Sequence, residues 1–273
     1  MNSFQEIKRF LWRARGVALP QIPCSDDLYI VEFPKSGITW FSTIVAAVLM
    51  EKNSGDLLEE SGGHGKSVVP FLNDLVPDLH MSGSVPAAMA ARWPGYRVLK
   101  SHSKGNPLYL KVIYIVRHPR AVMGSYYDYC CGLGTYTGDF LSFVNDRRFG
   151  VKAWADHVRS WVDRTYESQR VVLLRYEDLK EDPVAVTSTT LGLMGVNVDR
   201  GMAERAVKFA EKQAMMRREA VILEHDLRSR FGRFSGFTFV NKARSAGDVE
   251  VSDAIANLID AQCGEIARAL GYP

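Results

Sequence analysis

Residues 28–50, LYIVEFPKSGITWFSTIVAAVLM, decide how this chain of 273 residues folds. The stretch opens with an almost unbroken apolar run, Leu28 to Phe33, which is typical of a strand buried on both faces, as in a parallel sheet. A second apolar run, Phe41 to Met50, predicts a buried helix. The heptapeptide PKSGITW, Pro34 to Trp40, lies between the two runs. The sequence therefore predicts a core strand that turns sharply into a helix.

The turn between strand and helix has the chemistry of an anion site. The first N–H groups of a helix have no partner within the helix, and the helix dipole favours a negative charge there. Gly37 allows the backbone to approach a ligand, Lys35 adds a positive charge, and Ser36 and Thr39 supply hydroxyl groups. The nucleoside-triphosphate pattern G-x-x-x-x-G-K-[ST] is absent, because the only glycine of the loop follows its lysine. The turn predicts a phosphate-type cradle with an aromatic residue, Trp40, at its rim.

Length and composition indicate one domain spanning 1–273. Hydrophobic residues make up 47% of the chain, enough for one large core, and the net charge of +3 gives no reason to expect nucleic-acid binding. The longest clean apolar run has about ten residues, well short of a membrane span. The N-terminus has no signal-peptide pattern, and the four cysteines form no C-x-x-C pair, so we expect a cytoplasmic protein. The six histidines show no metal-ligand spacing, and no metal is expected.

Taken whole, PKSGITW resembles the PKSGTTW loop of the cytosolic-type sulfotransferases, which holds the 5′-phosphosulfate of 3′-phosphoadenosine 5′-phosphosulfate (PAPS). Ile38 replaces the first threonine of the family loop, which removes a side-chain hydroxyl and no backbone donor. The resemblance implies that Trp40 stacks on the adenine and that Lys35 also takes part in catalysis. It assigns donor binding to six consecutive residues: Lys35, Ser36, Gly37, Ile38, Thr39 and Trp40.

A second motif follows the short strand expected at Tyr96 to Lys100. Its carboxyl end leads into Ser101 and His102, and ligands of open α/β sheets bind at such ends. The segment LKSHSKGNP resembles the LKTHLP segment of the family, in which the histidine is the catalytic base. The resemblance implies that His102 is the base and Lys100 its neighbouring catalytic cation. The residues after His102 diverge from the family.

A third motif begins with the apolar strand expected at Lys111 to Val116. KVIYIVRHPRAVMGSYYDY is similar over its whole length to KIIYVxRNPKDVxVSYY of the family, whose arginine and serine bind the 3′-phosphate of the nucleotide. The resemblance gives these roles to Arg117 and Ser125. Pro119 suits the first position of the helix that follows, and Ser125 lies about two helical turns beyond Arg117.

A fourth motif, RYEDLKEDP, follows the strand expected at Val171 to Leu174 and is close to RYEDLKxDP of the family. The resemblance implies that Tyr176 contacts the adenine, and Asp182 also fits a helix N-cap. Near the C-terminus the family has an RKGxxGDW loop that grips the 3′-phosphate. This chain has NKARSAGDV there, and both Lys242 and Arg244 are candidates for that contact.

Apolar spacing predicts helices at 151–166, 187–194, 199–209 and 252–270, with Trp154 and Trp161 as packing residues. The glycine- and aromatic-rich segment 131–146 is expected to be a loop at the acceptor site. Aromatic side chains near the expected site hint at a partly apolar alcohol or phenol as the acceptor: Phe71, Tyr126, Tyr127, Tyr129, Tyr136 and Phe140. Which residues of 53–95, 131–150 and 228–245 line the acceptor pocket stays open.

Together the four motifs imply the P-loop NTPase-like sulfotransferase fold, an α/β three-layer sandwich with a central, mostly parallel sheet flanked by helices. They imply transfer of a sulfuryl group from PAPS to a hydroxyl or amine of a small molecule, leaving adenosine 3′,5′-bisphosphate (PAP), without a metal. A kinase-like P-loop phosphotransferase is one alternative, although GK[ST] is missing. A non-catalytic PAP-binding module is another, although Lys35 and His102 are retained. Nucleic-acid and membrane partners are not expected, and a homodimer is left open.

Overall fold

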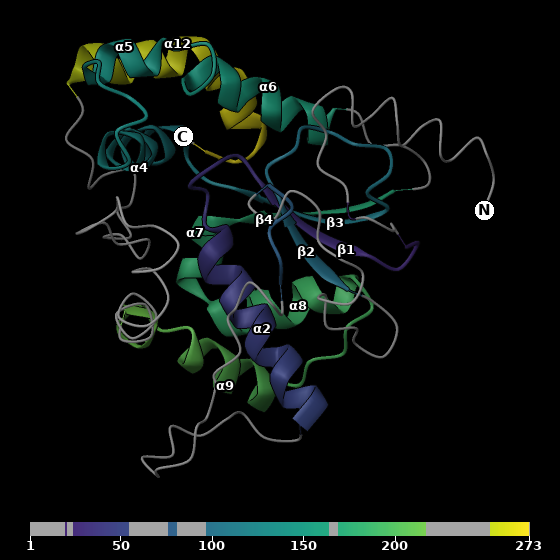
Figure 1. The fold of residues 1–273 in the computed structure, drawn as a ribbon. Helices are drawn as coiled ribbons and strands as arrows, with labels where there is room; N and C mark the ends of the chain where they lie inside the picture. Colours follow the sequence, from purple (N-terminus) through teal and green to yellow (C-terminus); the bar gives the residue numbers. More distant parts are fainter. Residues whose placement is uncertain are drawn as a thin grey trace. The chain divides into compact units, whose positions relative to one another are not determined.

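The computed structural model describes residues 20, 24–54, 76–80, 97–163, 169–216 and 252–272. The chain divides into two compact units. The first comprises Met1–Val116 and Ser160–Val207, and the second comprises Arg117–Arg159 and Lys208–Pro273. Figure 1 labels their helices and strands. The single domain expected over 1–273 stays a prediction.

The sheet belongs to the first unit and is built from β1 (Leu28–Glu32), β2 (Val98–Ser101), β3 (Lys111–Val116) and β4 (Arg170–Arg175). The strands run parallel in the order β2-β1-β3-β4. Every residue of β1 is buried, because this central strand pairs with β2 on one side and β3 on the other. The parallel sheet of the sequence analysis is confirmed, and its parallel pairing places the carboxyl ends of all four strands at one edge.

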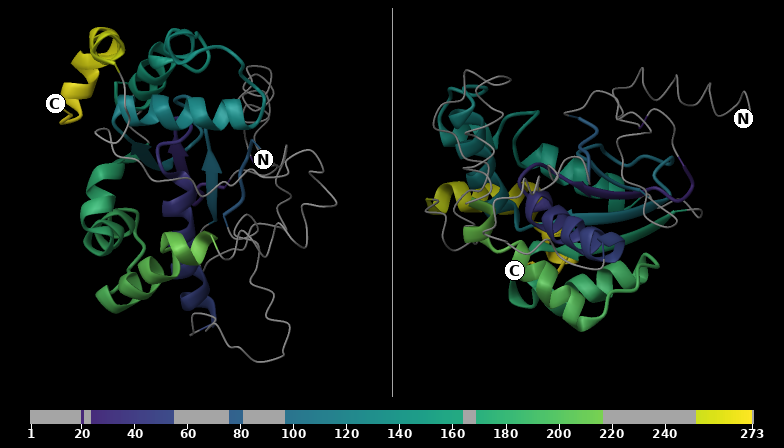
Figure 2. Two further views of the ribbon diagram at one scale, coloured as in Figure 1. Left: turned by 90° about the vertical axis from the view of Figure 1, so that its left-hand side faces the viewer. Right: turned by 60° about the horizontal axis from the view of Figure 1, so that its bottom comes forward.

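The helices of the first unit gather on one side of the sheet in Figure 1: α2 (Ile38–Ser54), α7 (Tyr176–Glu181), α8 (Pro183–Leu193) and α9 (Arg200–Phe209). Figures 1 and 2 agree in placing α9 beside α2, and an ion pair between Arg205 and Glu51 joins the two helices. Asp182 caps α8 as expected, because its side chain accepts a hydrogen bond from the Ala185 N–H at 3.0 Å. α2 begins at Ile38, three residues before the expected apolar run, so the second half of the PKSGITW loop is already helical.

The second unit contains α4 (Pro119–Gly132), α5 (Phe140–Val144) and α12 (Asp253–Ala269), and α6 (Val151–Val162) runs from it into the first unit. An ion pair between Arg120 and Asp260 joins α4 to α12. The expectation of a loop over 131–146 was wrong in part, since α5 forms inside it. Asp139 starts α5 by accepting a hydrogen bond from the Ser142 N–H at 2.7 Å, and Phe143 and Val144 bury its inner face.

Trp154 and Trp161 of α6 are buried, as expected for packing residues. Of the described helices, none combines the length and the apolar character that crossing a membrane requires.

A buried ion pair at the start of β1 anchors the first unit. Arg97 donates from Nε and Nη2 to the two carboxylate oxygens of Asp27, each at 2.7 Å, and both side chains are 1% exposed. Asp27 also accepts hydrogen bonds from the Cys24 N–H at 2.8 Å and the Tyr29 hydroxyl at 3.3 Å. The hydrogen bonds to Asp27 are the main reason that the pKa of Arg97 is raised.

We expect Arg97→Met to lower the free energy of unfolding by about 3–5 kcal/mol, because it leaves a buried carboxylate without its cation. Urea denaturation measures the loss. The matched control is Lys111→Met, which removes the exposed Lys111–Asp26 pair, 3.2 Å long, and should cost under about 1 kcal/mol. Equal losses in the two variants would contradict the prediction.

Candidate functional site

The PKSGITW loop joins β1 to α2 in a turn that holds two residues, Lys35 and Gly37, at positive φ. Gly37 has a φ of 121°, which glycine adopts without strain. Lys35 has a φ of 75°, and for a residue with a side chain this left-handed conformation costs about 1–2 kcal/mol. The Ser36 hydroxyl and N–H both donate to the Phe33 carbonyl oxygen, at 2.9 and 3.2 Å, and tie the turn to the end of the strand. The loop is thus a specific, strained turn.

Tyr176 lies against the loop, although it follows β4 and is far away in sequence. A Cβ atom at position 37 would lie 2.5 Å from Cδ2 of Tyr176, so the ring fills the space that only glycine leaves. The rings of Tyr176 and Trp40 meet edge to face, with centroids 5.9 Å apart. The structure therefore brings together the phosphate-type loop and both residues expected to contact an adenine.

Glu32, the last residue of β1, holds the loop from the strand side and was missed by the sequence analysis. Its carboxylate accepts hydrogen bonds from the Lys35 N–H at 3.1 Å and from the Ile38 N–H at 2.7 Å. Among the described residues, no acceptor is found for the N–H groups of Gly37 and Thr39. The loop thus keeps backbone donors for an anion beside the two that Glu32 takes. A carboxylate interrupting an apolar strand was the sequence signal that could have pointed to this residue.

His102 lies just past β2, the strand beside β1, as the sequence predicted. Its Nδ1 is 4.0 Å from Oε1 of Glu32, and its Nε2 is 3.7 Å from Oδ2 of Asp78. The segment that carries Asp78 pairs with the end of β2: the Leu79 N–H donates to the Lys100 carbonyl oxygen at 3.0 Å. The anion loop and His102, which are expected to act on the two substrates of a transfer reaction, thus follow neighbouring strands of the sheet.

Burial lowers the pKa of His102 to about 4, although the nearby Asp78 carboxylate acts to raise it. The imidazole is therefore neutral at pH 7 and can accept a proton. Burial likewise lowers the pKa of Lys100, and the carboxylates of Asp78 and Glu32 oppose that shift. Lys100 is 9% exposed and lies in β2, two residues before His102.

The sequence analysis also missed His80 and Asp78. The rings of His80 and His102 have centroids 5.6 Å apart. The backbone N–H of His80 donates a hydrogen bond to the Asp78 carboxylate at 2.8 Å. Nε2 of His80 lies 3.3 Å from the Ser101 hydroxyl and 3.4 Å from the Ser103 hydroxyl. Both residues come from 53–95, a segment for which the sequence offered no local pattern, so no signal would have found them.

We expect the His102 ring to titrate in solution with a pKa near 4, against an ordinary value of 6.5. Asp78→Asn should lower this pKa further, because the carboxylate raises it, and His80→Gln should raise it, because His80 lowers it. Ring-proton NMR titration measures all three values. The pKa of His102 is lower in the folded protein than in the unfolded chain. The contribution of the neutral ring to the free energy of unfolding is therefore complete above pH 6.5 and is lost as the pH falls toward 4. Shifts of the same sign in both variants would contradict the assignment.

Aromatic packing supports the segment around His102. Trp161 donates from Nε1 to the Ser103 carbonyl oxygen at 2.9 Å, and its ring lies 6.0 Å from that of Tyr109. Tyr109 stacks on Tyr29 of β1, with ring centroids 3.8 Å apart. These rings tie the segment after β2 to the central strand.

The residues expected at a 3′-phosphate belong to the second unit or lie outside the described residues. Arg117 follows β3 directly and is 5% exposed, and Ser125 lies in α4 with intermediate exposure. Lys242 and Arg244 lie outside the described residues. The contact of these four residues with one phosphate stays a prediction.

The expected acceptor-site aromatics form a cluster within the second unit. The rings of Tyr126, Tyr127 and Tyr136 each meet Phe143 edge to face, with centroids 5.0–5.6 Å apart. Their role as an acceptor wall stays a prediction, and Phe71 lies outside the described residues.

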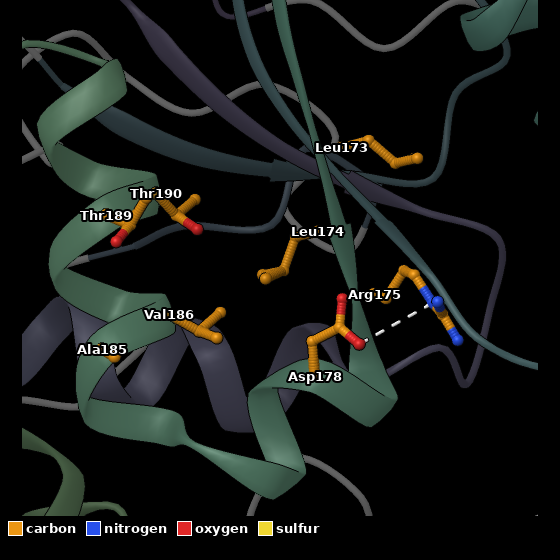
Figure 3. A pocket seen from close by; sticks show the side chains of 8 residues that line it. All are labelled: Leu173, Leu174, Arg175, Asp178, Ala185, Val186, Thr189 and Thr190. Atoms are coloured by element: carbon orange, nitrogen blue, oxygen red, sulfur yellow. Dashed lines mark ion pairs between the residues drawn. The ribbon is translucent and has the colours of Figure 1, made fainter. Parts of the chain in front are cut away.

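A depression between β4 and α8, shown in Figure 3, is a separate feature of the first unit. Leu174 points toward Val186 and Thr190 of α8, and an ion pair of 3.9 Å joins Arg175 to Asp178 at one end. The residues that line it are Leu173, Leu174, Arg175, Asp178, Ala185, Val186, Thr189 and Thr190. They include none of the residues expected to carry chemistry. Across the described part of the chain, no three His, Cys, Asp or Glu side chains are grouped as a metal site would require.

Known proteins resemble this chain in sequence and in fold. A family model described as "Sulfotransferase domain" matches residues 25–248. Sulfotransferase 1B1 of Mus musculus is 28% identical over 211 residues, covering 73% of this chain and 68% of the relative. Sulfotransferase 1B1 of Canis lupus familiaris is 33% identical over 173 residues, covering 58% of this chain and 55% of the relative. The chain thus spans about half to two thirds of the length of these relatives.

Among solved structures, retinol dehydratase in complex with androsterone and PAP has a similar fold. It has a TM-score of 0.66 at 14% identity, over 94% of this chain and 85% of that one. This likeness confirms the sulfotransferase fold expected from the motifs. The family model covers most of the chain, including all four motifs up to Pro183 and the C-terminal loop as far as Asp248. The chain therefore belongs to the sulfotransferase family.

Proposed function

We propose that the protein transfers the sulfuryl group of PAPS to a hydroxyl or amine of a small-molecule acceptor. One observation carries the proposal: the anion loop after β1 and the neutral imidazole of His102 after β2 flank the same carboxylate, Glu32. Groups suited to binding an anionic donor and to accepting a proton thus lie at adjacent strand ends, where α/β sheets bind their ligands. The PAP held by retinol dehydratase supports the choice of donor.

The loop fits the phosphosulfate end of such a donor. The N–H groups of Gly37 and Thr39 at the start of α2 and the charge of Lys35 can bind an anion there. The donor supplies the sulfuryl group, and its leaving group is a phosphate. Lys35 and the loop N–H groups would stabilise the charge that grows on that phosphate, which is often the largest contribution to catalysis.

The imidazole of His102 would accept the proton of the acceptor hydroxyl or amine as it attacks sulfur. The ring is unprotonated at neutral pH, and the Asp78 carboxylate 3.7 Å away would stabilise the imidazolium that forms. Lys100, the neighbouring cation, would stabilise negative charge beside the base. Trp40 would stack on the adenine, and Tyr176 would contact it. The 3′-phosphate would be bound by the residues that the family motifs assign, Arg117, Ser125 and Lys242 or Arg244.

Labelled PAPS incubated with a panel of phenols, steroids, sugars and amines tests the proposal, with and without EDTA. We expect transfer to at least one acceptor, unaffected by the chelator, and binding of PAP by calorimetry. PAP binding without transfer to any acceptor class would instead indicate a non-catalytic binding module. Magnesium-dependent binding of ATP without PAP binding would favour a phosphotransferase. The expected cytoplasmic location and the expected absence of nucleic-acid and membrane partners stay predictions, and the homodimer stays open.

A further inference from the structure

Glu32 is an unusual residue for its place in the fold. It ends β1, a strand in which every residue is buried, and its own side chain is only 3% exposed. Burial of a carboxylate is costly unless hydrogen bonds or opposite charges compensate for the lost water. Part of the compensation at this position comes from groups that the proposed function uses.

The first of these groups is the backbone of Lys35. Its N–H donates to Glu32 at 3.1 Å, and the residue is held at a φ of 75°. A strained residue persists only where its surroundings fix it. The carboxylate is one such constraint, so Glu32 helps to set the direction in which the Lys35 side chain leaves the loop.

The second group is the N-terminus of α2. The Ile38 N–H, the first of the helix, donates to Glu32 at 2.7 Å. A charge-assisted bond of this length at the positive end of a helix dipole fixes where the helix starts. The positions of the neighbouring N–H groups of Gly37 and Thr39 follow from that start.

His102 is the next neighbour of the carboxylate, with its Nδ1 4.0 Å from Oε1 of Glu32. The Glu32 carboxylate also acts on Lys100, where it favours the charged form. One side chain is therefore in contact with the loop and next to the base and its neighbouring cation.

We propose that Glu32 is a positioning residue that fixes the anion loop and the base relative to each other. This inference rests on the proposed function, because it assigns Glu32 to the same transfer reaction. Glu32 acts through Lys35, Ile38 and His102 and contacts neither substrate. The competing reading is that the carboxylate occupies the place of the donor phosphate and must leave before the donor binds. The two readings predict opposite changes in donor affinity.

The test compares Glu32→Gln and Glu32→Ala with the matched control Glu51→Gln. Glu51 is another buried carboxylate of the first unit, 7% exposed and paired with Arg205. It lies thirteen residues after Ile38 in α2, about 20 Å along the helix axis. Circular dichroism and thermal melting establish whether each variant is folded. If Glu32→Ala is not folded, the test relies on Glu32→Gln alone.

Glutamine can accept one of the two loop hydrogen bonds through its carbonyl oxygen but cannot accept the second through its amide nitrogen. We expect kcat to fall about 10-fold in Glu32→Gln and about 100-fold in Glu32→Ala, on the basis of about a 10-fold loss for each charge-assisted bond. PAP should bind several-fold more weakly in both, and amide hydrogen exchange at Lys35 and Ile38 should accelerate. Glu51→Gln should change none of these quantities.

Tighter PAP binding in Glu32→Gln would overturn the positioning role in favour of the competing reading. Unchanged kcat and unchanged amide exchange in both Glu32 variants would also overturn it. Amide exchange can be measured without turnover, so it tests the positioning role of Glu32 separately from the proposed sulfuryl transfer. If the unaltered protein transfers no sulfuryl group, the proposed function fails, and amide exchange alone then decides whether Glu32 fixes the loop.

Discussion

Replacement of His102 by alanine is expected to lower kcat for sulfuryl transfer by about 10²–10⁴-fold, the usual contribution of a positioned general base. The ring lies past β2 with Asp78 3.7 Å from one nitrogen and Glu32 4.0 Å from the other, and burial keeps it neutral. No other described residue near the loop combines a lowered pKa near 4 with this position. PAP affinity should change by less than about 3-fold, because the loop contacts do not involve His102.

Steady-state kinetics with labelled PAPS and calorimetry with PAP separate the two effects. The control is His80→Ala, which removes the neighbouring exposed imidazole and should lower kcat less than 10-fold. Surviving turnover with lost PAP affinity would remove His102 from the role of base and place it in the donor site.

Replacement of Lys35 by alanine is expected to lower kcat by about 10²–10³-fold, comparable to the loss of one preorganised donor for a developing anion. The lysine is in the middle of the strained turn, and its charge is expected beside the leaving phosphate. PAP affinity should also fall, because PAP retains the 5′-phosphate that the loop would bind. The measurement is again kcat, KM for PAPS and the Kd of PAP.

Lys35→Gly separates the charge of this residue from its backbone strain. Glycine adopts a positive φ without a steric penalty, so the variant should unfold no more easily than the unaltered protein, yet lose activity as Lys35→Ala does. Lys52→Ala, in the last turn of α2, is the control for loss of one lysine. Retention of full kcat in either Lys35 variant would show that the loop stabilises the transition state without this cation.

Local patterns predicted β1 and β3 well because burial on both faces leaves a continuous apolar run. β3 was predicted with its observed bounds, Lys111–Val116, and β1 ends one residue earlier than predicted, where Phe33 turns away into the loop. The family resemblance implied that Trp40 and Tyr176 would contact the same adenine. Their rings do lie 5.9 Å apart, although α7 begins more than 130 residues after the loop.

What the sequence could not reveal depends on partners brought together by folding. Asp78 reaches His102 only because its segment pairs with the end of β2, and no periodicity marks that pairing. Glu32 looked like an interruption of an apolar strand, and only the geometry shows that its carboxylate binds the loop. α5 was missed because five residues are too few for a helical pattern to emerge from a glycine-rich segment.

The indole of Trp161 provides an intrinsic optical reporter for the base. Its N–H binds the carbonyl of Ser103, the residue that follows His102, and the side chain is 2% exposed. Emission from a shielded indole depends on the polarity and hydrogen bonding immediately around it. A variant retaining Trp161 alone of the five tryptophans would therefore record rearrangement around the imidazole in stopped-flow traces, without any attached dye.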